Sequence, residues 1–205
     1  MKNICLLSLF CLLLFSGCKE FHCPAFPDNY LALLPQLSEG EMVVYSNGEE
    51  SITLFVRGYE KSKERFEAKN CDCHVCDISA SLQLGNDEIS LSYGVYNTTN
   101  NIISLKKQYG IVIQMKRLLL DSNNDDSLFE VVYNNETGIY ESRFNVSALE
   151  EIESMEISRI VYNNVLCLIS DREDFYLQKV YYEKHNGIVR FETVDGKVWN
   201  LVKSK

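Results

Sequence analysis

Histidine, proline and tryptophan are scarce in this chain of 205 residues, which contains three histidines, three prolines and one tryptophan. Enzymes that move protons near neutral pH commonly use histidine. Here His22 and His74 lie beside cysteines and His185 begins a predicted turn, so we expect each to be a loop residue rather than a catalytic base. With few prolines and 46% hydrophobic residues, the composition excludes a disordered chain.

The motifs of several large enzyme classes are also missing. The chain contains no G-x-S-x-G, no H-E-x-x-H, no G-x-x-x-x-G-K-[ST] and no G-x-G-x-x-G. Their absence argues against an elbow-type serine hydrolase, a zinc peptidase, a P-loop nucleotidase and a dinucleotide-binding enzyme. The sequence therefore predicts no catalytic residue and no cofactor.

Basic residues are outnumbered, with 20 lysines and arginines against 29 aspartates and glutamates and a net charge of −9. Binding to nucleic-acid phosphates needs clustered lysine and arginine, so we expect no nucleic-acid partner. The acidic balance is typical of a solvated, self-repelling surface. Beyond the N-terminal segment, no apolar run approaches the roughly 20 residues that a membrane-spanning helix needs.

The N-terminal segment has the pattern of a bacterial lipoprotein signal. Lys2 supplies a positive charge, Ile4–Phe15 is apolar, and two small residues precede Cys18. The apolar run is itself short of the roughly 20 residues that cross a bilayer. We expect cleavage after residues 1–17, acylation of Cys18 so that it enters the lipid bilayer, a tether over residues 18–22 and a single β-rich domain over residues 23–205.

Segments rich in valine, isoleucine, tyrosine and phenylalanine alternate with turn signals along the rest of the chain. The signals are Asn47-Gly48, which suits a type I′ turn, Gly85-Asn86, residues 134–138, residues 185–187 and Asp195-Gly196. Turn signals spaced roughly every 8–12 residues are typical of all-β domains. We predict a mainly β domain, an antiparallel meander of about ten strands that forms a curved sheet, a half-barrel or a sandwich.

Helical signals are few. Asn29–Leu34 precedes Pro35 and has room for one helical turn. Ser147 and Glu150 form a capping-box pattern before Glu151–Met155. We therefore expect one or two short helices beside the sheet.

The cysteines after Cys18 are the densest chemical feature of the chain. Disulfides are the usual state of cysteines in a cell envelope, so the candidates for bridges are Cys23, Cys71, Cys73 and Cys76. Five cysteines follow Cys18, so at least one stays unpaired. We expect this to be Cys167, which lies in the apolar run Val165–Ile169, as a buried free thiol.

Two other uses of this cluster remain open. Three thiolates and an imidazole form a zinc ligand set, which makes Cys71, Cys73, His74 and Cys76 weak metal candidates. The run lacks two separated ligand pairs, and neighbouring ligands would point apart, so we do not predict a metal. A redox role is disfavoured because the spacing is not C-x-x-C at a helix start.

Three segments carry a resemblance to a known group of proteins. They are Cys18 followed by Cys23-Pro24-Ala25-Phe26-Pro27, then Cys71-Asp72-Cys73, and finally the ending Val180–Phe191 with Asp195–Trp199. In these segments the chain resembles uncharacterised lipoproteins of Bacteroidota. The resemblance implies a lipid-anchored protein of the bacterial cell envelope, at the outer membrane and on either its periplasmic or its surface face, with a β-rich fold and no assigned activity.

These observations favour a non-catalytic binding or interaction module of the envelope, with an unknown envelope protein or ligand as partner. One alternative is a carrier of an apolar ligand, because 12 tyrosines and 10 phenylalanines are enough to line a cavity. Another is a carboxylate-dependent hydrolase, which would require two carboxylates in one cleft and a strongly shifted pKa.

Overall fold

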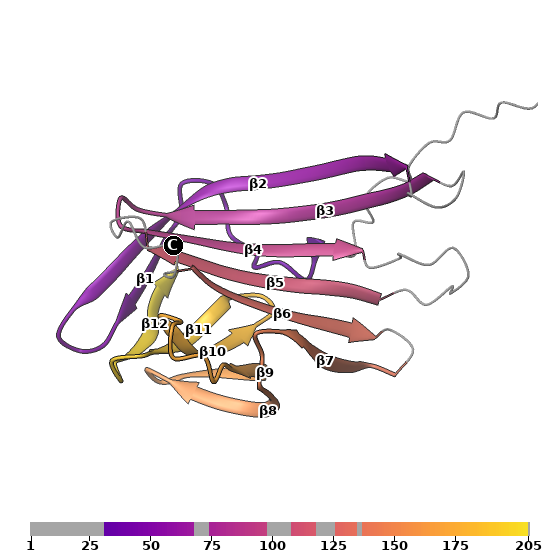
Figure 1. The fold of residues 1–205 in the computed structure, drawn as a ribbon. Coiled ribbons are helices and arrows are strands. Elements are labelled where there is room, and N and C mark those ends of the chain that lie inside the picture. Colours follow the sequence, from indigo (N-terminus) through magenta and orange to yellow (C-terminus); the bar gives the residue numbers. More distant parts are fainter. Residues whose placement is uncertain (1–30, 68–73, 98–107, 118–125, 135–136, 205) are drawn as a thin grey trace, which may run out of the picture.

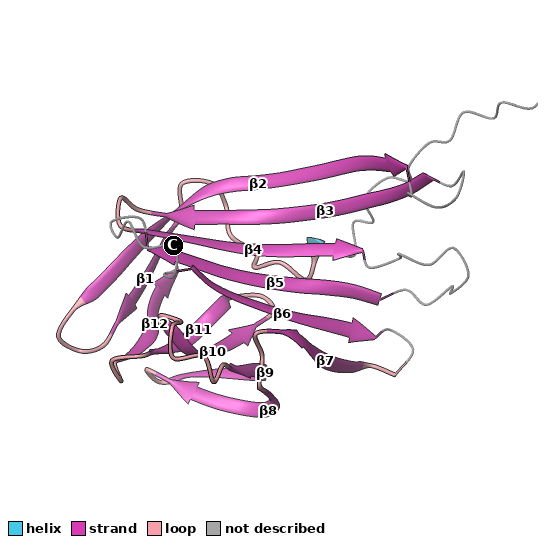
Figure 2. Cartoon of the chain, viewed as in Figure 1, coloured by secondary structure: helices cyan, strands magenta, loops and turns pink. Residues whose placement is uncertain are grey.

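The computed structural model describes residues 31–67, 74–97, 108–117, 126–134 and 137–204, and these residues form twelve strands. The strands are β1 (Met42–Ser46), β2 (Ser51–Glu67), β3 (His74–Gly85), β4 (Ile89–Asn97), β5 (Gln108–Arg117), β6 (Asp126–Asn134), β7 (Ile139–Phe144), β8 (Ala148–Ile157), β9 (Ile160–Ile169), β10 (Leu177–Glu183), β11 (Gly187–Thr193) and β12 (Val198–Ser204). Figures 1 and 2 show that they dominate the molecule. The predicted mainly β class is confirmed, with twelve strands rather than about ten.

All twelve strands belong to one antiparallel sheet, with the order β7-β6-β5-β4-β3-β2-β1-β12-β11-β10-β9-β8. Almost every pair of neighbours is a sequential hairpin. The exception is β1, which pairs with β12 through partners such as Ser46 and Asn200 and so joins the two ends of the described chain. Strands β7 and β8 follow each other in sequence and form the two edges. The meander therefore curls into a nearly closed barrel (Figure 1).

One wall of the barrel, which includes β4 and β6, faces another wall, which includes β10 and β11, across the core. Aromatic rings meet between these two walls, with Tyr93 against Tyr182 at 6.0 Å and Phe129 against Phe175 at 6.2 Å between ring centroids. The hydroxyl of Ser127 on β6 also accepts a hydrogen bond of 3.0 Å from the backbone nitrogen of Leu177 on β10. Inward residues from both walls thus fill one shared core.

The segment before β1 fills one end of this barrel. Leu33, Leu34 and Leu37 are buried there. The hydroxyl of Tyr182 donates a hydrogen bond to the backbone oxygen of Leu33. The backbone nitrogen of Gln36 donates a hydrogen bond of 2.9 Å to the backbone oxygen of His185. The N-terminal end of the described chain is therefore fixed beside the turn between β10 and β11. Leu31 is helical, and the first residues of the helical turn predicted over Asn29–Leu34 lie outside the described residues.

The helix predicted from the capping-box residues Ser147 and Glu150 is wrong, because Glu151–Met155 belongs to β8. The apolar residues of this segment lie opposite apolar residues of β9, Leu149 beside Leu168 and Ile152 beside Val165. Pairing with an already buried strand therefore outweighs the local capping signal.

The predicted type I′ turn at Asn47-Gly48 is also wrong. Gly48 has a φ of 97°, but Asn47 is not in the left-handed region. The Asn47 side-chain oxygen instead accepts hydrogen bonds from the backbone nitrogens of Glu49 and Glu50. The hairpin thus turns one residue later, around Gly48 and Glu49.

Candidate functional site

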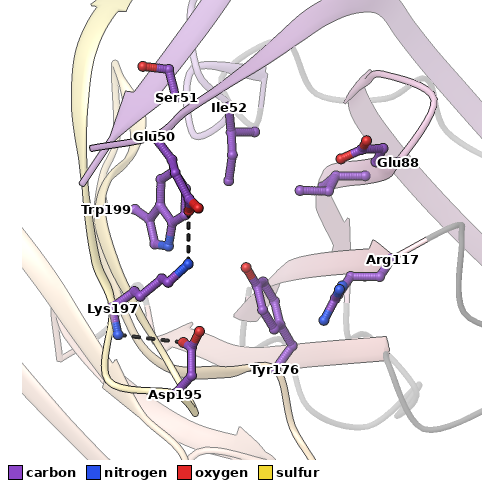
Figure 3. Close-up of a pocket in the computed structure, with 10 residues that line it drawn as sticks. Glu50, Ser51, Ile52, Glu88, Arg117, Tyr176, Asp195, Lys197 and Trp199 are labelled. Atoms are coloured by element: carbon purple, nitrogen blue, oxygen red, sulfur yellow. Dashed lines mark hydrogen bonds and ion pairs between the residues drawn. The ribbon is translucent and has the colours of Figure 1, made fainter. Parts of the chain in front are cut away.

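A pocket of about 460 Å³ opens at the end of the barrel opposite the buried segment of residues 31–37. Three turns meet there, those between β1 and β2, β3 and β4, and β11 and β12, together with the last residue of β5 (Figure 3). The lining residues are Glu50, Ser51, Ile52, Glu88, Ile89, Arg117, Tyr176, Asp195, Lys197 and Trp199.

The pocket has an apolar floor and a charged rim. Ile89 and Trp199 are buried, whereas Ile52, Arg117 and Tyr176 are half-buried. The remaining lining residues, which carry carboxylates, an ammonium group and a hydroxyl group, are exposed. A ligand that entered would exchange hydrogen bonds at the rim and contact aromatic and aliphatic groups below, which is the usual composition of a small-molecule site.

An ion pair between Glu50 and Lys197 closes one side of the rim. Lys197 Nζ lies 2.8 Å from Glu50 Oε2. The hydrogen bond from Lys197 lowers the pKa of Glu50, and the same bond raises the pKa of Lys197. Both side chains are largely exposed, at 57% and 44% of their surface, so water competes for each partner and the pair can open for a ligand at little cost.

Asp195 organises the turn between β11 and β12. The hydroxyl of Thr193 donates a hydrogen bond to its carboxylate, and the backbone nitrogen of Lys197 approaches the same oxygen at 3.5 Å. The hydroxyl bond is the main cause of the lowered pKa of Asp195. Gly196 follows with a φ of 80°, which suits glycine. The carboxylate therefore stays ionised and holds Lys197 in place over the pocket.

Arg117 and Glu88 carry the other two charges of the pocket. The guanidinium of Arg117 lies over the ring of Tyr176, 4.9 Å from its centroid, which fixes the cation in position. Burial raises the pKa of Tyr176, so its hydroxyl keeps its proton. Among the described residues, neither Arg117 nor the Glu88 carboxylate has an ion-pair partner. As far as the described residues show, the pocket thus contains one cation and one anion that form no ion pair.

Trp199 supplies an unpaired hydrogen-bond donor at the floor. Its ring stacks on Phe191 with centroids 5.9 Å apart and planes inclined by 13°. Its Nε1 is buried and has no hydrogen-bond partner in the described structure. In Figure 3 this nitrogen lies on the side of the ring that faces the Glu50–Lys197 pair. A buried donor without a partner costs roughly 1–3 kcal/mol, and a ligand acceptor reaches this nitrogen only when the side chains beside it, such as the Glu50–Lys197 pair, move apart.

The residues singled out from the sequence lie elsewhere. Cys18, Cys23, Cys71 and Cys73 are outside the described residues. His74 and Cys76 lie in β3, opposite Glu67 and Arg65 of β2, and their side chains are not described. Over the described ranges, no three metal-ligating side chains come together. The disulfides therefore stay a prediction, and Cys71, Cys73, His74 and Cys76 stay weak metal candidates.

The remaining cysteine and histidine agree with expectation. Cys167 is a buried free thiol in β9, and burial raises its pKa. The prediction of a free thiol at this position is confirmed. His185 lies in the turn between β10 and β11, as its place in the sequence indicated.

Sequence reasoning did not find the pocket. Its charged residues are ordinary turn residues, and nothing local marks them as a group. One signal was available, because alternate turns of an antiparallel meander lie at the same end of the sheet. Glu50, Glu88 and Asp195 each follow or occupy a turn of this kind, but only the pairing of β1 with β12 brings the last of them to the other two.

Comparison of the chain with protein-family models, curated proteins and solved structures gave no match. A search of the described residues for a helix of membrane-spanning length and hydropathy also found none. Any statement about function therefore depends on the geometry of the fold and the pocket.

Proposed function

We propose that this chain is a lipid-anchored, non-catalytic binding module of a bacterial envelope, held at the outer membrane by acylated Cys18 and presenting the pocket to a small ligand. The supporting observation is the position of the pocket at the end of the barrel opposite residues 31–37. Cys18 precedes Leu31 by 13 positions (31 − 18), and the segment that begins at Leu31 lies at the end of the barrel far from the pocket, which favours an anchor on that side. A ligand then reaches the pocket from the side away from the bilayer.

The charges of the pocket favour binding over hydrolysis. A carboxyl group that protonates a leaving group needs a raised pKa. Glu50 and Asp195 have lowered pKa values, because Lys197 and Thr193 donate hydrogen bonds to them. Both stay ionised at neutral pH and act as hydrogen-bond acceptors. Neither group therefore supplies the general acid that the hydrolase alternative requires.

An apolar carrier is also less well supported. The large aromatic side chains of the interior, among them Tyr45, Tyr93 and Phe191, are fully buried against one another. The described pocket is lined by five charged side chains instead, namely Glu50, Glu88, Arg117, Asp195 and Lys197. Desolvating these charges against a hydrocarbon ligand would be costly.

Metabolic labelling with radioactive palmitate tests the proposal. We expect the full chain to incorporate the label and to sediment with the outer-membrane fraction, and the C18A variant to do neither. C167A is the matched control, because Cys167 is a buried thiol that takes no part in anchoring. A wild-type chain that keeps its leader, or that stays unlabelled in soluble form, would overturn the proposal.

A further inference from the structure

We propose that the pocket binds a short peptide of two or three residues with a free amino terminus and a free carboxyl terminus. This inference rests on the proposed function and names the ligand class of the same site. Three groups of the pocket without partners among the described residues carry it, and a short peptide brings one complementary group for each.

The first two groups are the charges of Arg117 and Glu88. Arg117 is held against Tyr176 but has no carboxylate partner among the described residues, and it presents donors in the geometry that a carboxylate accepts bidentately. Glu88 lies one residue before Ile89, which pairs with Arg117 in the ladder between β4 and β5. An anion in the turn before β4 and a cation at the end of β5 therefore lie at the same end of this strand pair. Their charges sum to zero, which suits a zwitterion.

The third group is the indole nitrogen of Trp199. This nitrogen lies beside Glu50 and Lys197, on the opposite side of the pocket from Arg117 (Figure 3). The ligand carboxylate that binds Arg117 therefore cannot also accept its hydrogen bond, and the ligand needs a second acceptor. A peptide carbonyl oxygen is such an acceptor. A free amino acid has no third polar group to offer, whereas a dipeptide has one.

Other small ligands fit less well. Sugars are commonly held by stacking on an open aromatic face. Here the ring of Tyr176 is covered by Arg117, and that of Trp199 is stacked on Phe191 and only 4% exposed. A polyanion such as a nucleotide would meet the carboxylates of Glu50, Glu88 and Asp195 at the rim.

The size of the pocket agrees with this ligand. Its volume of about 460 Å³ lies toward the lower end of the range of roughly 300–1,000 Å³ for small-molecule sites. Ile52 and Ile89 give the floor an apolar contact surface. The ligand side chains would therefore be small or aliphatic.

Trp199 makes the test direct, because it is the only tryptophan of the chain and its fluorescence reports on this site alone. The full chain in detergent is titrated with L-leucyl-L-alanine and L-leucyl-L-alanyl-L-alanine. Tryptophan emission and isothermal calorimetry are followed in parallel. We expect saturable binding in both measurements. The N-acetylated dipeptide, which lacks the ammonium group, and the dipeptide amide, which lacks the carboxylate, should each bind about tenfold more weakly or not at all.

Charge-removing variants place the ligand in the pocket. R117Q and E88Q should each weaken the zwitterionic dipeptide by about tenfold. R117Q should leave the residual affinity for the dipeptide amide unchanged, because the amide lacks the carboxylate that Arg117 binds. R143Q and E156Q are matched controls, because both residues are exposed on strands β7 and β8 and neither lines the pocket. They should bind as the wild type does.

Two results would overturn the inference. One is the absence of binding by both zwitterionic peptides, or equal binding of the acetylated form. The other is heat of binding without any change in Trp199 emission, which would place the ligand elsewhere. If palmitate labelling succeeds while the peptides fail, the ligand class is wrong and the anchored module stands. If labelling fails, the proposed function itself falls.

Discussion

The hydroxyl oxygen of Tyr93 on β4 accepts a hydrogen bond of 3.0 Å from the backbone nitrogen of Ile188 on β11. The two residues are 95 positions apart and lie on opposite walls of the barrel. Tyr45 donates to the backbone oxygen of the same residue at 2.9 Å. Both polar groups of the Ile188 backbone are thus satisfied by tyrosines, in a place where water cannot reach them.

Replacement of Tyr93 by phenylalanine should lower the free energy of unfolding by roughly 1–3 kcal/mol. The aromatic ring remains, but the amide of Ile188 loses its acceptor in a buried site. Urea denaturation at pH 7 measures the change. Y140F is the control, because no hydrogen bond of the Tyr140 hydroxyl is found in the described structure, and it should alter stability by less than about 0.5 kcal/mol. Equal effects of the two variants would contradict the role of the Ile188 bond.

Stability should fall as the pH rises above 10. Burial raises the pKa of Tyr93 and of Tyr140 to about 12, from an ordinary value of 10.0, and raises those of Tyr45 and Tyr182 well above it. Below pH 10 these tyrosines keep their hydroxyl protons in both the folded and the unfolded chain, so their contribution to stability is fully present. Between pH 10 and about 12 only the unfolded chain loses them, so each such tyrosine lowers the stability by up to about 1.4 kcal/mol per pH unit.

Denaturation series at pH 8, 10 and 11 test this expectation. Y140F should reduce the slope above pH 10 while leaving the stability at pH 8 nearly unchanged, because its hydroxyl contributes through protonation and not through a hydrogen bond of the described structure. A stability that stays constant up to pH 11 would show that these tyrosines are hydrated.

Introduction of Asn-Gly at Ser158-Arg159 should stabilise the hairpin of β8 and β9. Ile157 pairs with Ile160, and the two residues between them have φ values of 52° and 69°, as a type I′ turn requires. Serine and arginine are strained there, whereas asparagine and glycine tolerate this region. The double variant S158N/R159G should gain about 1 kcal/mol in thermal or urea unfolding.

Replacement of a glycine that has a positive φ by alanine provides the control. G48A should lose stability, because Gly48 has a φ of 97° in the first hairpin although nothing lies within 4 Å of a Cβ at that position. If S158N/R159G is destabilising, the β8–β9 turn does not have the left-handed geometry that the structure gives it.

Two glycines of the β4–β5 ladder should respond differently to alanine. A Cβ at Gly110 would clash with the ring of Tyr96, whose hydroxyl contacts Glu130, whereas a Cβ at Gly94 would meet Val112 at an ordinary 3.6 Å. G110A should therefore cost roughly 1–3 kcal/mol through overpacking. G94A should be neutral or slightly stabilising. Urea unfolding of both variants measures the two changes in the free energy of unfolding. If G110A is as stable as the wild type, the Tyr96 side chain can move away from the sheet without destabilising the fold.

Much of the β-rich fold was readable from local signals. Turns at Gly85-Asn86, residues 185–187 and Asp195-Gly196 lie within a residue or two of the observed hairpins. At these positions the residues that signal a turn in the sequence are the same residues that form the turn in the structure. Asn86, for example, accepts hydrogen bonds from the backbone nitrogens of Glu88 and Ile89.

The missed elements share a different cause. Strand β8 carries acidic residues and a capping box, and its turn is made by Ser158 and Arg159, which give no turn signal. Strand β5 has no glycine-rich turn signal directly beside it. Both strands form because neighbouring strands offer hydrogen bonds and apolar partners, which a local pattern does not contain.

Local sequence patterns predicted the mainly β content, the hairpin turns at Gly85-Asn86, residues 185–187 and Asp195-Gly196, and the burial of Cys167, because turn geometry and alternating polarity act over a few residues. Tertiary structure alone decided that β1 closes on β12, and that Glu88, Arg117 and Trp199 line one pocket. These residues come from three strands or turns, and their meeting depends on strand pairing across more than a hundred positions, for which no local propensity exists.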